Sequence, residues 1–168
     1  MVQWLLALAL QLAAGSPFPT TSRTAWMVPD AFHMNIGMSR ADAEAVIHRY
    51  GWQASPGKYS RQLVIKYDET KTVNVQFVDD KVQSMRFEYV GFIPDVKVAY
   101  EEMLGQIERS LGYKGAKQKS DRTVLLFDRK TPNVMLVLST SRDDSFGVQG
   151  LGFLAVRYYD PAAERIIP

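Results

Sequence analysis

The residue types that usually carry catalysis are scarce in this chain. It has only two histidines, His33 and His48, and no cysteine. A general base needs a partner within hydrogen-bond reach, and neither histidine stands at a ligand spacing from the other or from a pair of acids. The lack of cysteine removes thiolate metal sites, thiol nucleophiles and disulfides. The sequence therefore predicts no metal site, no cofactor and no catalytic residue.

Clustered acids and hydroxyl groups do not change this expectation. Adjacent acids occur as Asp79-Asp80, Glu101-Glu102 and Asp143-Asp144. Neighbouring side chains on a strand or turn point apart, so such pairs need partners from elsewhere before they can act as acid and base. Ser139 lacks the Gly-x-Ser-x-Gly elbow, and the glycines of 147–152 precede a strand pattern, whereas a phosphate loop opens a helix. We expect a non-enzymatic protein, with a hydrolase of unrecognised type as an alternative.

The first fifteen residues have the pattern of a signal peptide. Residues 1–15 carry no charged side chain, contain an apolar run over 4–10, and end in Ala13-Ala14-Gly15. This run is too short to span a bilayer, and the small residues suit cleavage near Gly15. Because Met1-Val2-Gln3 supplies no lysine or arginine, an uncleaved anchor or a buried helix is the alternative. We predict a protein that is periplasmic or secreted after cleavage.

Two regions follow the predicted signal peptide. Residues 16–35 are rich in Ser, Thr and Pro, which predicts a flexible lead segment. Within it, Trp26-Met27-Val28 either packs irregularly at the margin of the domain or pairs as an edge strand. Residues 36–168 are predicted to form a single α+β domain.

The charge pattern argues against nucleic-acid binding. The chain has 20 basic and 18 acidic side chains, a formal net charge of +2, and the two signs are interspersed along it. One basic cluster stands out, formed by Lys114, Lys117, Lys119 and Arg122. We interpret it as a solvated surface, with peripheral contact to an anionic membrane as the less favoured alternative.

The domain contains two similar blocks, residues 36–92 and 93–160. Each begins with an amphipathic helix, near Ser39–Tyr50 and Asp95–Leu111, and each helix is followed by a glycine that can stop it. Strand patterns follow at Arg61–Tyr67, Thr72–Val78, Val82–Val90, Arg122–Phe127, Asn133–Thr140 and Leu151–Tyr159. We therefore predict tandem α-β-β-β repeats that form one antiparallel sheet, with the two helices packed on one side.

The strands of the two blocks differ in how they alternate. The strands of 72–78 and 82–90 alternate apolar with polar residues, which predicts one face open to water. The strands of 122–127, 133–140 and 151–159 are apolar on both faces. The far face of this second half should therefore be covered, by another part of the same domain, by the lead segment, by a second subunit or by a partner. A homodimer through the second-half strands is one such arrangement.

The first block resembles two related groups of envelope proteins. Over about residues 36–89, Gly37-Met38-Ser39 begins a short helix that Gly51 stops, and a strand, polar turn and strand follow as Phe77-Val78-Asp79-Asp80-Lys81-Val82. In these features the chain resembles the SmpA/OmlA family and the beta-lactamase-inhibitor-protein-like fold. The resemblance implies a non-enzymatic envelope protein that assists outer-membrane assembly or grips another protein on a concave sheet. The chain differs from both groups in having no cysteine for lipidation or disulfides.

These patterns predict an exported protein-binding or envelope-assembly module that uses a face of its sheet. The candidate contact residues are four outward polar side chains and three loop aromatics: Asn74, Gln76, Arg86, Glu88, Trp52, Tyr59 and Phe146. Each also has a simpler interpretation, since the polar residues can serve solubility and the aromatics can belong to the core. The alternative function is a carrier of a small apolar ligand, held between the sheet and the lead segment.

Overall fold

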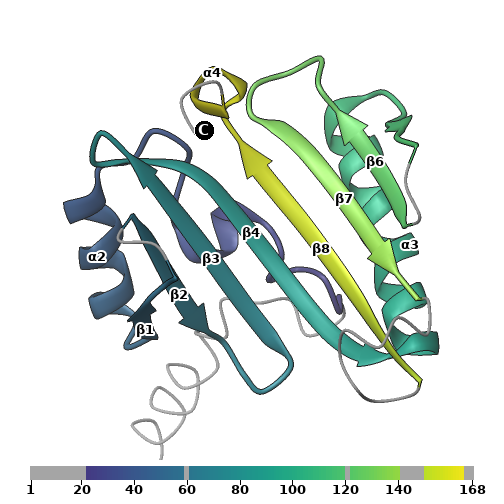
Figure 1. Ribbon diagram of the computed structural model, residues 1–168, viewed down its shortest axis with the longest axis horizontal. Coiled ribbons are helices and arrows are strands. Elements are labelled where there is room, and N and C mark those ends of the chain that lie inside the picture. Colours follow the sequence, from purple (N-terminus) through teal and green to yellow (C-terminus); the bar gives the residue numbers. More distant parts are fainter. Residues whose placement is uncertain (1–21, 59–60, 120–121, 141–149, 165–168) are drawn as a thin grey trace, which may run out of the picture.

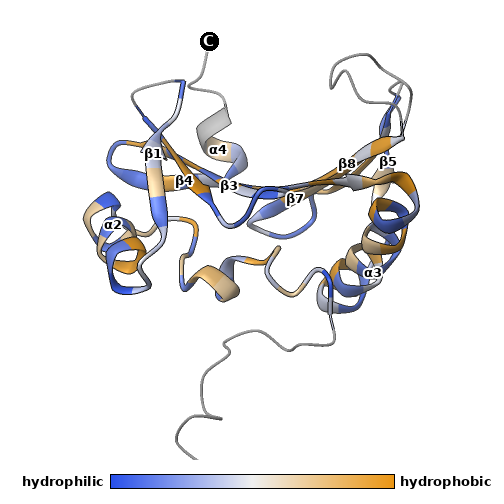
Figure 2. Cartoon of the chain, turned by 90° about the horizontal axis from the view of Figure 1, so that it is seen from below, coloured by the Kyte–Doolittle hydropathy of each residue, from blue (hydrophilic) through white to orange (hydrophobic). Residues whose placement is uncertain are grey.

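The computed structural model describes residues 22–58, 61–119, 122–140 and 150–164. Within these residues, one antiparallel sheet of eight strands forms a layer, and helices α2 (Arg40–Arg49) and α3 (Ile93–Leu111) lie on one side of it (Figures 1 and 2). This confirms the predicted α+β class and the placement of both helices on one face. A short 3-10 helix, η1 (Pro29–Phe32), lies between them, and α4 (Pro161–Glu164) follows the last strand.

The strand order places the ends of the two halves at the centre of the sheet. The strands are β1 (Gln53–Pro56), β2 (Gln62–Lys66), β3 (Lys71–Val78), β4 (Lys81–Phe92), β5 (Ala116–Lys117), β6 (Thr123–Phe127), β7 (Asn133–Ser139) and β8 (Leu151–Tyr159). Their spatial order is β1-β2-β3-β4-β8-β7-β6-β5. The central pair β4 and β8 runs antiparallel in a continuous register from Ser84↔Tyr159 to Phe92↔Leu151. The sheet is therefore shared by both halves of the chain.

Each half has a helix followed by four strands, one more than the sequence predicts. The additional strands, β1 and β5, are the two edges of the sheet, and every residue in them is exposed. Without a buried face they lack the alternation that marks the other strands, which explains why the sequence analysis misses them. The shared element order does not establish a sequence repeat, because α2 has 10 residues and α3 has 19.

Both helices begin and end with recognisable local signals. At α2, the Ser39 hydroxyl accepts a hydrogen bond from the Asp42 amide at 3.1 Å, which satisfies one of the free N–H groups of the first turn. At α3, a proline lies in the first turn and Gly112 ends the helix in the left-handed region at φ 77°. No helix among the described residues is both long and apolar enough to cross a membrane.

Residues 22–38, which we call the crossing segment, correct one expectation. The sequence analysis assigns 16–35 to a flexible lead, but the described part of it is packed into the core. Four of its large apolar side chains are at most 5% exposed, namely Trp26, Met27, Phe32 and Met34. The segment runs between α3 and α2 beneath the sheet (Figure 2). Its apolar residues are irregularly spaced, so they fill the space between the two helices without forming a long helix themselves.

The sheet consequently has two different faces. The helical face carries the core side chains of the central strands, among them Val75, Met85, Phe87, Val156 and Tyr158. We call the opposite side the outer face; by strand alternation it carries Asn74, Gln76, Arg86 and Glu88 in the first half, and Val124, Met135, Val137, Phe153 and Arg157 in the second. The crossing segment covers the helical face, so its described residues do not provide the predicted cover for the second half's outer face.

Candidate functional site

The four polar residues predicted as contacts lie together on the outer face of β3 and β4. Glu88 is the centre of the group: its carboxylate accepts from Thr72 and Asn74, each at 3.1 Å, and pairs with the Arg86 guanidinium at 2.8 Å. Gln62 on β2 donates to the Asn74 carbonyl at 3.1 Å. Neighbouring strands therefore join these side chains into one ladder of hydrogen bonds. Such a ladder presents a fixed polar surface, because its members hold one another in place.

Gln76 stands at the end of this ladder. Its side-chain oxygen accepts from the Ser84 hydroxyl at 3.3 Å, across the same pair of strands. Ser84 is 5% exposed, so this contact also satisfies a buried hydroxyl. The structure thus brings all four predicted polar residues onto one surface.

The outer face changes from mostly polar to mostly apolar side chains where β4 pairs with β8. Arg86 lies opposite Arg157, and each guanidinium covers an aromatic ring: Arg86 lies 5.6 Å from the centre of Phe153, and Arg157 lies 4.8 Å from that of Tyr159. Beyond them, the side chains of Val124, Leu126, Met135, Val137 and Leu151 are partly exposed. At the end of β4, Phe92 is 69% exposed. A polar ladder and an apolar strip therefore lie side by side, with two arginines at the border.

Of the three predicted aromatic contacts, the structure describes one, Trp52, and it does not join this surface. Trp52 packs against Phe32 of the crossing segment, with ring centres 4.6 Å apart, and stacks on Tyr50 at 5.1 Å. It therefore packs on the helical side against the core, which is the simpler of the two interpretations that the sequence allows for it, and its role as a binding anchor stays a prediction. Tyr59 and Phe146 lie outside the described residues.

The histidines and the basic cluster occupy separate places. His33 stacks on Tyr50, with ring centres 4.8 Å apart, and His48 is exposed in the last turn of α2. Lys114, Lys117 and Lys119 are exposed at and beside edge strand β5. Within the described part of the chain, no group of three or more His, Asp or Glu side chains is arranged to hold a metal ion.

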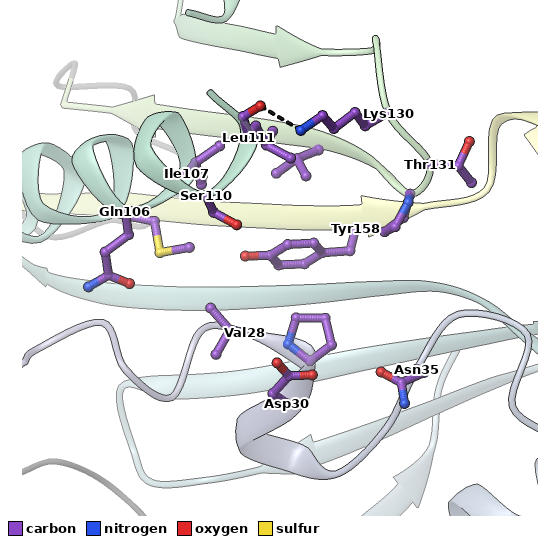
Figure 3. Close-up of a pocket in the computed structure, with 14 residues that line it drawn as sticks. Val28, Asp30, Asn35, Gln106, Ile107, Ser110, Leu111, Lys130, Thr131 and Tyr158 are labelled. Atoms are coloured by element: carbon purple, nitrogen blue, oxygen red, sulfur yellow. Dashed lines mark hydrogen bonds between the residues drawn. The ribbon is translucent and has the colours of Figure 1, made fainter. Parts of the chain in front are cut away.

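A cavity on the helical face involves residues that the sequence analysis does not single out. It has a volume of about 450 Å³ and lies between the crossing segment, α3 and the turn between β6 and β7 (Figure 3). Tyr158 of β8 forms part of its floor, and Asp30 and Ser110 stand on opposite walls. Burial, and the nearby Asp30 carboxylate, raise the pKa of the Tyr158 hydroxyl well above its usual value. No sequence signal joins these residues, because three distant segments contribute them.

Comparison with known proteins leaves the chain without an assigned relative. No protein-family model matches it, and neither a curated protein nor a solved structure matches it. The resemblance of the first block to envelope proteins is therefore an untested expectation.

Proposed function

We propose that this chain is an exported, non-enzymatic binding domain that holds a partner protein on the outer face of its sheet. The observation that carries the proposal is the combination on one face of a polar ladder with a partly exposed apolar strip that ends at Phe92. Protein interfaces commonly combine an apolar centre with a hydrogen-bonded polar border. Export follows from the signal-like pattern of residues 1–15, which lie outside the described residues.

The charges of this face indicate the chemistry of the partner. Lys66, Arg86 and Arg157 point to the outer side, and Glu88, which is paired with Arg86, is the acid among them. A partner with an apolar patch bordered by carboxylates would complement both the strip and the arginines. Arginines that already lie over aromatic rings are held in place, which reduces the entropy lost when a carboxylate binds them.

Capture followed by an affinity measurement tests this proposal. The chain serves as bait for an envelope extract, beside a double variant Phe92→Ala, Arg86→Glu and a control variant Val98→Ala. Val98 is a matched control because it is an exposed apolar residue, 53% accessible, but lies on α3 on the other side of the sheet. We expect the double variant to lose a partner that the control retains, and the purified partner to bind the double variant at least tenfold more weakly.

Two results would contradict the proposal. One is a partner whose affinity is unchanged in the double variant, which would place the contact elsewhere. The other is the capture of no partner by any of the three baits. A bait that elutes at twice the monomer mass, and loses this state in the double variant, would instead assign the outer face to a homodimer.

A carrier of a small apolar ligand is the second candidate function. The cavity of about 450 Å³ favours it, since it lies between the sheet and the crossing segment, where the sequence analysis places such a pocket. Its volume falls within the usual range for small-molecule sites. The described residues provide no geometry in favour of the hydrolase alternative.

A further inference from the structure

The cavity on the helical face has apolar walls that the core holds in place. Met103 and Ile107 of α3 and Val134 of β7 line it, and each is at most 3% exposed. Val28 of the crossing segment faces them across the space (Figure 3). Because these residues belong to three different parts of the fold, the cavity is a consequence of how α3 and the crossing segment meet over the sheet. It is an interior space between packed elements that opens to the surface near Asp30 and Ser110, both of which are exposed.

One polar group in this cavity has no partner. Tyr158 is 9% exposed, its ring packs edge-on against Phe87 at 5.9 Å, and its hydroxyl points into the cavity between α3 and the crossing segment (Figure 3). No hydrogen bond joins this hydroxyl to any described residue, and the hydroxyl is accessible from the cavity, so a ligand there can accept its proton. Because burial and the Asp30 carboxylate raise its pKa, the hydroxyl stays protonated and can donate.

Two of the other polar side chains of the lining are already engaged within the fold. The Lys130 ammonium donates to the carbonyl oxygen of Leu111 at 2.8 Å, and so binds the end of α3. The Gln106 amide nitrogen donates to the Thr24 hydroxyl at 2.9 Å and to that of Ser22 at 3.2 Å. Asp30 contributes a carboxylate at the entrance. The cavity therefore combines the Tyr158 hydroxyl with the polar side chains of Asn35, Ser110 and Thr131, with apolar residues, and with a carboxylate at its mouth.

We infer that this cavity binds a neutral, largely apolar small molecule through an oxygen that accepts a hydrogen bond from Tyr158. The apolar walls select an apolar body, and the buried donor selects a carbonyl, ether or hydroxyl oxygen. A carboxylate would be repelled by the Asp30 carboxylate at the entrance, and the Lys130 ammonium, which also lines the cavity, already donates to the carbonyl oxygen of Leu111. An ammonium group has no lone pair to accept the Tyr158 proton, so it could not form this hydrogen bond.

A matched set of fluorescent probes tests this inference on the full-length chain. The ketone 6-propionyl-2-dimethylaminonaphthalene supplies an apolar body and an accepting oxygen. The compound 2-dimethylaminonaphthalene lacks the carbonyl, and 6-dimethylamino-2-naphthoate carries a carboxylate. We expect the ketone to bind at one site and more tightly than either of the others. Failure of the ketone to bind, or tighter binding of the carboxylate, would overturn the inference.

Substitutions then locate the site. Tyr158→Phe keeps the ring and its contact with Phe87, and should weaken ketone binding about threefold to tenfold, the range of one hydrogen bond, while leaving the carbonyl-free probe unchanged. Ser110→Trp places a bulky side chain at the entrance and should abolish binding of both. Val98→Trp, on the same helix and 53% exposed, is the control and should alter neither.

The same variants keep this inference separate from the proposed protein-binding surface. Equal ketone affinity in Tyr158→Phe, or full binding in Ser110→Trp, would overturn the inference provided that thermal unfolding shows both variants to be folded. The outer-face variant Phe92→Ala, Arg86→Glu should bind the ketone as the unsubstituted chain does. A loss of protein binding without a loss of ketone binding, or the reverse, would therefore show which of the two sites has failed.

Discussion

Two segments of very different kind cover the helical face of the sheet. Helix α3 is long and regular, and buries Val96, Tyr100, Met103 and Ile107 along one stripe. The crossing segment of residues 22–38 contains only the four-residue η1, yet it buries Trp26, Met27, Phe32 and Met34. The comparison teaches that a regular helix is not required for a segment to complete a core. An irregular segment can do so where two helices leave a gap between them.

The two segments are also bonded to each other. Arg23 pairs with Asp95 at 2.9 Å, the Ser22 hydroxyl donates to Glu102, and Gln106 donates to Thr24. Farther along, Trp26 stacks on Tyr67 with ring centres 5.7 Å apart, which attaches the crossing segment to the sheet. Both segments line the cavity, the crossing segment from Val28 to Asn35 and α3 from Met103 to Leu111. Its shape therefore depends on both segments staying in place.

Deletion of residues up to Asn35 removes most of the crossing segment and is expected to have the largest effect on the stability of the fold. It removes four large apolar side chains that are at most 5% exposed, and truncation of a single buried side chain of this size costs about 2–5 kcal/mol against a total stability of about 5–15 kcal/mol. We expect a chain that begins at Ile36 to lose cooperative unfolding in circular dichroism. A chain that begins at Ser16 keeps the segment and is the control. An unchanged transition in the shorter chain would show that the segment is dispensable.

A pair of substitutions measures whether the two segments stabilise the core equally. Phe32 and Met103 are both 0% exposed, one in the crossing segment and the other in α3. We expect Phe32→Ala to lower the free energy of unfolding by about 3–5 kcal/mol and Met103→Ala by about 2–5 kcal/mol, from denaturant titrations. Val98→Ala, at an exposed site of α3, should stay within about 0.5 kcal/mol. A loss below about 1 kcal/mol for Phe32→Ala would contradict the expectation that the crossing segment and α3 stabilise the core equally.

The attachment between the segments is expected to contribute less than the core does. Gln106→Ala removes the donor to Thr24, whose side chain is buried at 0% exposure, and so leaves that hydroxyl without this partner. We expect a loss of about 1–3 kcal/mol in thermal or chemical unfolding, and faster amide exchange near Thr24. Glu101→Ala, an exposed neighbour on α3, is the control. Faster exchange in the control to the same extent would mean that the effect belongs to the helix and not to the attachment.

The smallest expected effect concerns the attachment of the crossing segment to the sheet, and this effect depends on pH. Lys71 lies over the rings of Trp26 and Tyr67, at 5.9 and 5.6 Å, and pairs with Asp68 at 2.7 Å. Burial alone would raise the pKa of Asp68, but hydrogen bonds from Lys71 and Thr70 outweigh it and hold that pKa below its usual 3.8. A lowered pKa stabilises the folded chain above pH 3.8, and this contribution is lost as pH falls through the folded value.

For Asp68→Asn we therefore expect a loss of about 0.5 kcal/mol or less at pH 7, since the Asp68 side chain is 41% exposed and solvent screens the pair. The difference from the unsubstituted chain should shrink as the pH falls below about 3.8, in urea titrations at a series of pH values. Glu69→Gln is the control, because its partner Lys66 contacts no ring of the crossing segment and Glu69 is 89% exposed. A difference that persists at pH 2 would exclude Asp68 ionisation as its cause.

The sequence was sufficient for the elements that bury one regular face. The spacing of Val96, Tyr100, Met103 and Ile107 predicts α3, and alternation in 72–78 predicts β3, because a buried stripe or face imposes a period on the residue types. Strands β1 and β5 are exposed throughout, so no such period marks them. The crossing segment is buried but irregular, and its composition alone suggested a flexible lead.

The sequence likewise predicts one part of the candidate sites and not another. Alternation correctly places Asn74, Gln76, Arg86 and Glu88 on one face, since this requires only the strand period and the register. That Glu88 organises the ladder, and that Tyr158 lacks a partner, depends on which distant segments meet. Tyr158 is one aromatic residue in an apolar strand, and its sequence neighbours do not show that its hydroxyl enters a cavity. The cavity, and the place of the Tyr158 hydroxyl in it, arise only when three segments that are distant in the sequence pack together.

The position of β8 has a consequence for the order in which the molecule can be completed. This strand follows the other seven described strands in the sequence, yet it lies at the middle of the sheet, between β4 and β7. During synthesis, strands β1–β4 and strands β5–β7 cannot be joined into one sheet until Leu151–Tyr159 has been made. Completion of the sheet therefore depends on a strand that is added after both of the groups it connects.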